Sequence, residues 1–80
     1  MDDYPLILVV WLDHTGESGW QTKKQVKNSK PARVKTIGWL VHEDKDTIKV
    51  CNSILKDGDL GGADCILRQC IVKRYEVDIK

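Results

Sequence analysis

The sequence predicts a small, mostly-β domain in which five strands form one strongly curved barrel with a single short helical segment. Apolar stretches rich in β-branched residues recur along the whole chain, clusters of turn-forming residues separate them, and one stretch has helical character. Closing five short strands into a barrel would also remove the exposed edges that threaten a small sheet. A chain of 80 residues is long enough for one domain and too short for two, so residues 1–80 are treated as a single domain.

The first strand is predicted over residues 5–12. Seven consecutive apolar residues lie between Pro5 and Asp13, which is typical of a strand buried on both faces or of one in a curled sheet. Residues 13–19 combine glycine, serine, threonine and aspartate, and this composition predicts a loop.

Residues 20–30 carry the helical signal. Thr22 is placed to cap a short helix over residues 23–27, with Val26 as its inward residue together with Trp20. The pattern is too short and too basic to stand alone. Pro31 ends the helix, because the residue before a proline avoids helical backbone angles.

Residues 32–42 are predicted to form a long second strand. Alternation places Ile37, Trp39 and Val41 on one face, which favours burial of Trp39, including burial at a subunit interface. Gly38 lies in the middle of the strand, where a bulge or sharp bend would re-aim the side chains.

A polar turn and a return strand complete a hairpin. The turn is predicted at residues 43–46 and the return strand at 47–51, with Ile48 and Val50 facing inward. The segment after it is predicted to be a surface loop over residues 55–63, because it is rich in glycine and aspartate.

Two short strands are predicted near the C-terminus. They cover residues 65–67 and 70–77, with a turn or bend at residues 68–69 between them. The three cysteines are an odd count without a Cys-X-X-Cys pair, which indicates buried or half-buried thiols in a reducing cytoplasm. A bridge from Cys51 to Cys65 or Cys70 remains the alternative.

The apolar run at the N-terminus is too short to span a bilayer, and the acidic Asp2 and Asp3 precede it where a secretory signal carries basic residues. We therefore expect no membrane contact and a cytoplasmic location, which means the host cytoplasm if the protein is phage-encoded.

Several short motifs resemble a pattern found in small phage and prophage proteins. In this chain the matching pieces are Trp11-Leu12-Asp13, Gly19-Trp20, Ile37-Gly38-Trp39-Leu40, His42-Glu43-Asp44 and Ile66-Leu67-Arg68. The resemblance implies a small accessory protein that binds a host or viral macromolecule, or a small ligand, as a homo-oligomer. One version is an inhibitor or sponge that acts against a bacterial defence system, and another is a structural virion component that acts through self-assembly.

The same order of pieces is similar, more distantly, to the Sm-like fold, a five-stranded SH3-like barrel. In that fold a glycine in a bent strand precedes an acidic turn, as Gly38 precedes Asp44 here, and residues 66–75 stand where the second Sm motif would lie. The chain departs from the pattern because its helical segment follows the first strand, and because it lacks a recognisable uridine-pocket loop. This resemblance implies an RNA- or DNA-binding module.

A basic segment is the main candidate binding surface. Its members are Trp20, Lys23, Lys24, Lys27, Lys30, Arg33 and Lys35. The cations would face phosphates, an acidic protein surface, or solvent alone, and the sequence leaves these three interpretations open. Acidic residues cluster elsewhere, at residues 43–46 and 57–64, so a basic sector and an acidic sector of two copies would also attract each other.

No catalytic, cofactor-binding or metal-binding residues are predicted. The histidines and cysteines lack the closely paired spacing of structural zinc sites. The segment Asp57-Gly58-Asp59 lacks the spaced oxygen ligands of a calcium loop. Neither a phosphate-binding glycine loop nor an HExxH motif occurs, so we expect a protein that binds rather than an enzyme.

Overall fold

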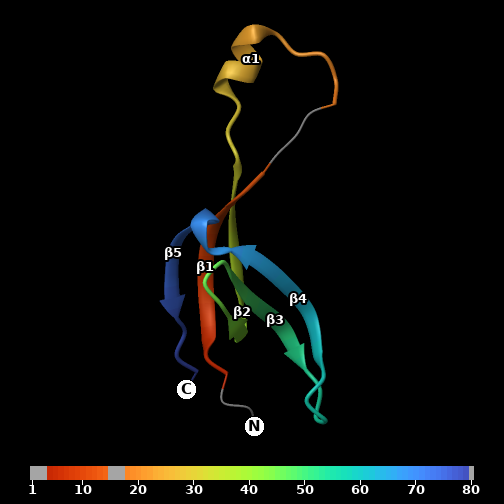
Figure 1. The fold of residues 1–80 in the computed structure, drawn as a ribbon, viewed down its shortest axis with the longest axis vertical. Helices are drawn as coiled ribbons and strands as arrows, with labels where there is room; N and C mark the ends of the chain where they lie inside the picture. The colour runs from red at the N-terminus through yellow and green to blue at the C-terminus, as the bar shows by residue number, and fades with distance from the viewer. Residues whose placement is uncertain (1–3, 15–17, 80) are drawn as a thin grey trace.

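The described chain is built from five strands, one short α-helix and one 3₁₀ turn (Figure 1). The computed structural model describes residues 4–14 and 18–79. The elements are β1 (Leu6–Asp13), α1 (Lys23–Asn28), β2 (Ala32–Glu43), β3 (Thr47–Ile54), β4 (Leu60–Leu67), η1 (Arg68–Cys70) and β5 (Ile71–Glu76). The predicted mostly-β fold with one short helix is therefore confirmed.

The strands form a single antiparallel sheet in the order β4-β3-β2-β1-β5. Neighbours in this order are consecutive in the chain except for β5, which returns to pair with β1. β4 and β5 are the edges, and neither pairs with the other among the described residues. The sheet is thus open at its hydrogen-bonded edges, so closure into a barrel stays a prediction.

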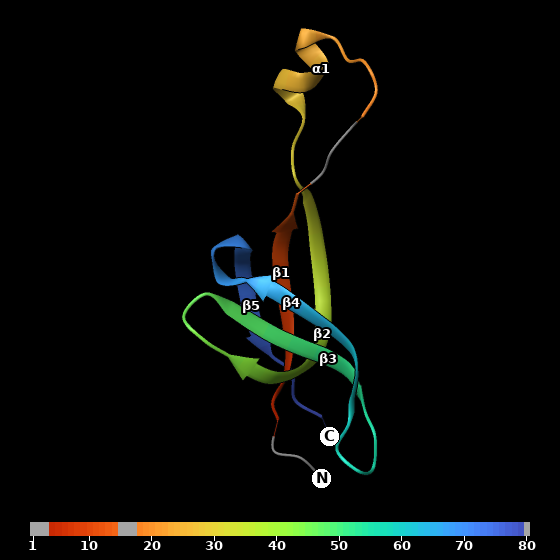
Figure 2. The same cartoon turned by 45° about the vertical axis from the view of Figure 1, so that its right-hand side comes forward.

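The sheet is strongly curled (Figure 2), and the buried residues form one core cluster on its inner face. Its buried members come from four strands: Ile7, Val9, Leu40, Ile48, Val50 and Ile66. A residue of β1 and a residue of β4 share this cluster although two strands separate them in the sheet, so the sheet must fold over on itself. Each such side chain contributes about 1.5–3 kcal/mol when it is buried.

The predicted inward face of β2 is wrong. Ile37 is 55% exposed, whereas Gly38 and Leu40, which have the opposite parity, are buried. Alternation separates the residues of a strand into two sets, but it does not say which set meets the core. Here the inner set includes a glycine, which contributes no apolar side chain to the pattern. The inward positions predicted for Ile48 and Val50 are confirmed.

Gly38 allows the backbones of β2 and β3 to approach closely. A Cβ atom at this position would lie 2.6 Å from the carbonyl oxygen of Cys51. The register shift between β2 and β3 falls between Leu40 and His42 rather than at the glycine. The irregularity in β2 therefore lies further along the strand than the predicted position at Gly38. Gly38 itself is needed because a side chain there would collide with the backbone of β3.

The predicted loop at residues 55–63 is too long, because β4 already begins at Leu60. A tight turn replaces it: the Leu55 N–H donates to the Asp59 carbonyl at 2.7 Å, and Gly58 has a φ of +102°. The edge strand is consequently eight residues long rather than the predicted three. The bend predicted at residues 68–69 is confirmed as η1.

All three cysteines are free thiols, and no bridge joins Cys51 to either of the others. Cys51 is buried and Cys70 is half-buried, as predicted, but Cys65 is exposed on the edge strand β4. In the part of the chain that the structure describes, no helix has the length and apolar character needed to cross a membrane. The predicted loop at residues 13–19 lies partly outside the described residues.

Candidate binding surface

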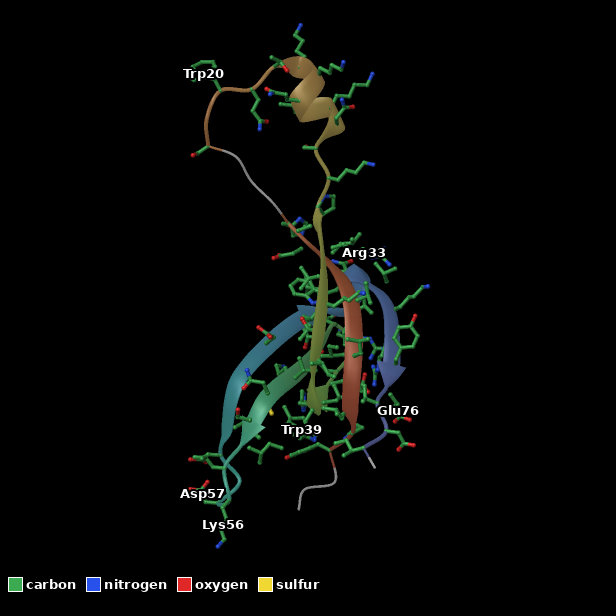
Figure 3. The ribbon with its side chains drawn as sticks, turned by 180° about the vertical axis from the view of Figure 1, so that it is seen from behind. Trp20, Arg33, Trp39, Lys56, Asp57 and Glu76 are labelled. Carbon is green, nitrogen blue, oxygen red and sulfur yellow. The ribbon has the colours of Figure 1, made fainter. Side chains whose placement is uncertain are left out.

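A projecting arm is the most prominent feature of the molecule. The last residue of β1, Asp13, pairs with the first residue of β2, Ala32, so both strands end together at one edge of the domain. Residues 18–31, which lie between them in the chain, extend away from the sheet along the long axis of the molecule, which measures 52 × 26 × 22 Å (Figures 1 and 3). We call residues 18–31 the arm.

Local hydrogen bonds shape the arm. The Thr22 hydroxyl oxygen accepts from the Gln25 backbone N–H at 3.1 Å, and the Gln25 side-chain oxygen accepts from the Thr22 backbone N–H at 2.9 Å. This reciprocal capping box satisfies two donors that the helix leaves unpaired. At the other end, Ser29 donates to the Val26 carbonyl from both its backbone N–H and its hydroxyl. The predicted capping role of Thr22 is confirmed.

The arm packs against no core. None of the residues of α1 is buried, Val26 is 57% exposed, and Trp20 is 105% exposed. The predicted inward packing of Val26 with Trp20 is wrong, because β1 and β2 carry the helix beyond the end of the sheet. A helix of this length is marginal in water without tertiary contacts.

The arm and the start of β2 together carry a concentrated positive charge. The basic surface consists of seven residues, all of which are exposed: Trp20, Lys23, Lys24, Lys27, Lys30, Arg33 and Lys35. Residues 18–35 contain six basic and no acidic residues, so they carry +6. Because the whole chain carries +1, the remainder carries −5. The near-neutral total therefore conceals a strongly bipolar molecule.

The lysines of α1 share one side of the helix. At about 100° per residue, Lys23, Lys27 and Lys24 fall within roughly one quarter to one third of its circumference. This arrangement disfavours the isolated helix. Lys23 and Lys27 repel each other at i, i+4, and a cation in the first turn opposes the helix dipole. A nearby anion would reverse both effects.

Trp39 lies on a different part of the surface, far from the tip of the arm (Figure 3). It is half-buried and pairs with Leu6 on the outer face of the sheet. Next to this pair, Ile37, Leu8 and Tyr75 form an apolar row across β2, β1 and β5. Arg33 and Lys35 have the same parity on β2, so the basic surface borders this row. The sequence pattern had marked Trp39 but not the row around it.

An ion-pair cluster, which the sequence pattern did not indicate, joins three elements. Glu43 of β2 accepts from Arg74 of β5 at 3.0 and 3.2 Å, and from Arg68 of η1 at 3.1 Å. The hydrogen bond from Arg74 is the largest cause that lowers the pKa of Glu43, and the same pair raises the pKa of Arg74. Arg68 also donates to the Asp44 carbonyl at 3.1 Å.

Asp44 organises the turn between β2 and β3. Its carboxylate accepts from the backbone N–H groups of Asp46 and Thr47 at 2.9 and 2.8 Å. These hydrogen bonds lower the pKa of Asp44 from 3.8 to about 2. Glu43 and Asp44 are thus already bonded within the chain, and the exposed acidic groups elsewhere on the surface include Asp46 and Asp64.

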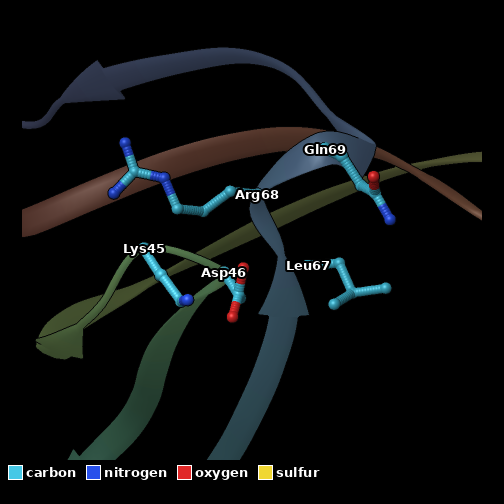
Figure 4. A pocket seen from close by; sticks show the side chains of 5 residues that line it. All are labelled: Lys45, Asp46, Leu67, Arg68 and Gln69. Atoms are coloured by element: carbon cyan, nitrogen blue, oxygen red, sulfur yellow. The ribbon is translucent and has the colours of Figure 1, made fainter.

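Two surface hollows lie away from the tip of the arm. The larger, about 400 Å³, is lined by Lys45, Asp46, Leu67, Arg68 and Gln69 (Figure 4). The smaller, about 220 Å³, is lined mainly by apolar atoms and includes Trp11 and Cys65. Trp11 packs against the core and donates from Nε1 to the Thr36 hydroxyl at 2.9 Å. Within residues 4–14 and 18–79, no three His, Cys, Asp or Glu side chains are grouped to hold a metal ion.

Comparison with protein-family models, curated proteins and solved structures finds no match to this chain.

Proposed function

We propose that this protein is a non-catalytic binding module that contacts an anionic macromolecular partner through its basic surface. The observation that carries the proposal is the arm itself, in which a fully exposed Trp20 stands beside a lysine-rich helix that buries nothing. An arm that adds no core residue contributes little to the stability of the domain, so the exposed lysines of α1 and the ring of Trp20 can serve an external contact.

The way in which charge is distributed over the molecule supports this function more than the net charge does. A net charge of +1 gives the molecule little overall attraction to anions, whereas the local +6 of the arm and the start of β2 creates a strong positive potential there. The opposite sign of the remaining chain would also orient an approaching anionic partner towards the arm.

Two variants with the same net charge test the proposal. In the arm variant, Lys23, Lys24 and Lys27 are all changed to Glu. In the control variant, the exposed Lys45, Lys56 and Lys73 are changed to Glu. Each variant takes the formal net charge from +1 to −5. On a heparin column, we expect the arm variant to elute at much lower salt than wild type, and the control variant to stay closer to wild type. Equal losses in both variants would contradict a function located in the arm.

The biological role that we propose rests on the resemblance to small phage proteins. In this role the module is an accessory protein that binds a host or viral component, such as an inhibitor or sponge directed at a bacterial defence system. Expression in a defended bacterial host should raise phage plating efficiency, and the arm variant should abolish this effect. If plating efficiency is unchanged in hosts with different defence systems, the proposed anti-defence role is wrong.

We further infer an SH3-like or Sm-like barrel as the fold type. Its support is the strand order, the curl that brings β1 and β4 into one core, and the 3₁₀ turn between β4 and β5. Pairing between the two edges, or between the edges of neighbouring copies, would complete such a barrel or extend it.

Self-association is a second candidate function, and the outer face of the sheet favours it. Ile37 and Tyr75 are 55% and 48% exposed in the same apolar row, beside the predicted interface residue Trp39. Together with the unpaired edge strands, this row would support a homo-oligomer, and in its extreme form a self-assembling virion component. Sedimentation of wild type and an Ile37→Lys variant tests it. A wild-type monomer at tens of micromolar would exclude this candidate.

A further inference from the structure

We propose that the partner of the arm is single-stranded nucleic acid, with Trp20 stacked on an unpaired base and the surrounding cations on the flanking phosphates. This inference rests on the proposed function and names its ligand. It draws on three observations: the exposure of Trp20, the kind and spacing of the cations, and the fact that no residue of α1 is buried.

Trp20 presents both faces of its indole to solvent, since it is 105% exposed. A flat aromatic ring in this position suits a partner that offers another flat ring. Every unpaired base offers a flat ring, whatever the nucleotide sequence. Stacking of bases on aromatic side chains is a common contact in proteins that bind single strands. A duplex keeps its bases stacked on one another and offers the indole no such face.

The cations around Trp20 are mainly lysines, and this favours phosphate over a protein partner. Lysine is a strongly hydrated point charge, which is depleted from the cores of protein–protein interfaces. A protein partner would need an apolar pocket for the indole and, around it, enough carboxylates to match five lysines and an arginine. A single strand presents bases and phosphates in alternation, so it matches an aromatic ring flanked by spaced cations.

Binding of phosphates would also stabilise α1, which is a marginal helix by itself. The helix buries no residue against the sheet, and Lys23 and Lys27 repel each other at i, i+4. Phosphates beside Lys23 and Lys27 would neutralise this repulsion. The arm is therefore expected to gain helix order when it binds, as segments that fold on their ligand do.

The test uses fluorescence anisotropy with labelled mixed-sequence single strands of RNA and DNA, the matching duplex, and poly-glutamate as a probe for acidic protein surfaces. Wild-type protein should bind the single strands more tightly than the duplex and than poly-glutamate. Trp20→Ala should weaken single-strand binding by about 5- to 150-fold, which is the range of one lost stacking contact. It should also remove the preference over duplex.

Charge provides the second readout. The arm variant should lose single-strand binding, whereas the control variant with Lys45, Lys56 and Lys73 changed to Glu should retain it. If all six cations meet phosphates, affinity falls on the order of 10²-fold between about 50 mM and 200 mM salt. Thermal unfolding of each variant checks that the domain is folded, and folding should persist because α1 buries nothing.

The possible failures are distinguishable. Binding of poly-glutamate through the arm, without binding of single strands, would overturn the nucleic-acid inference and leave the proposed function standing. Wild-type affinity in Trp20→Ala would overturn the stacking contact and with it the choice of single strands. Binding to none of the probes through the arm would overturn both the inference and the proposed function.

Discussion

Glu43, the last residue of β2, forms a two-point ion pair with Arg74 of β5, although β1 lies between these strands in the sheet. Arg74 pairs with Val9 in the ladder, and paired residues of antiparallel strands lie on the same face of the sheet. Because Val9 faces the core, the side chain of Arg74 also projects towards the inner face. Glu43 reaches it because the sheet curls and brings the end of β2 across that face. The pair therefore connects two parts of the sheet that hydrogen bonding leaves apart.

We expect Glu43→Gln and Arg74→Gln each to lower the midpoint of thermal unfolding, by a few degrees at most because both side chains are about one-third exposed. The double variant should lose less than the two single changes together, since each already breaks the same pair. Raising the salt concentration should shrink all three effects. Strictly additive losses would show that the two residues act separately.

Asp44 predicts a specific dependence of stability on pH. Its pKa is lowered from 3.8 to about 2 because the backbone N–H groups of Asp46 and Thr47 bond its charged form. The stabilisation is complete above the ordinary pKa and is lost as the pH falls through about 2. Asp44→Asn should therefore be less stable than wild type at neutral pH, and the difference should shrink between about pH 4 and pH 2.

Thermal unfolding across this pH range measures the effect of Asp44. Asp46→Asn is the matched control, because it removes a charge from the same turn and leaves the backbone N–H that bonds Asp44. The control variant should keep the wild-type dependence. A difference between wild type and Asp44→Asn that does not change with pH would contradict this role of the carboxylate.

Gly38→Ala should destabilise the domain by about 1–3 kcal/mol, the usual cost of overpacking. The added Cβ would meet the Cys51 carbonyl oxygen at 2.6 Å, and a backbone atom of a paired strand cannot rotate away. Gly19→Ala is the control, since nothing lies within 4 Å of the Cβ position there. Chemical denaturation of both variants makes the comparison, and equal stability would show that β2 and β3 can separate without cost.

Thr22→Ala should loosen α1 without lowering the stability of the domain. Loss of the cap removes about 1 kcal/mol of helix stability, but α1 contributes no buried residue to the core. Amide hydrogen exchange should speed up at Gln25 and Val26 while the midpoint of thermal unfolding stays constant. Thr22→Ser keeps the capping hydroxyl and should retain the slower exchange. A fall in the unfolding midpoint for Thr22→Ala would mean that the arm packs on the domain in solution.

Features that depend on residues close together in the chain could be predicted from the sequence. Thr22 and Gln25 are three positions apart, so the capping role of Thr22 could be predicted from neighbouring residues alone. The hairpin around Asp44 is likewise local, and Ile48 and Val50 alternate with polar neighbours on a strand whose inner face is buried. The exposure of the lysines and the arginine of the basic surface also follows directly from their charge, whereas that of Trp20 does not.

Only the tertiary structure decided the remaining features, because they depend on how distant segments pack. Alternation along β2 is equally consistent with either face inside, and the curl of the sheet selected the face of Gly38 and Leu40. The pairing of Glu43 with Arg74 has no local signal at a separation of 31 residues. The exposure of Val26 likewise depends on where β1 and β2 end, since a helix carried past the sheet finds no apolar surface to cover it.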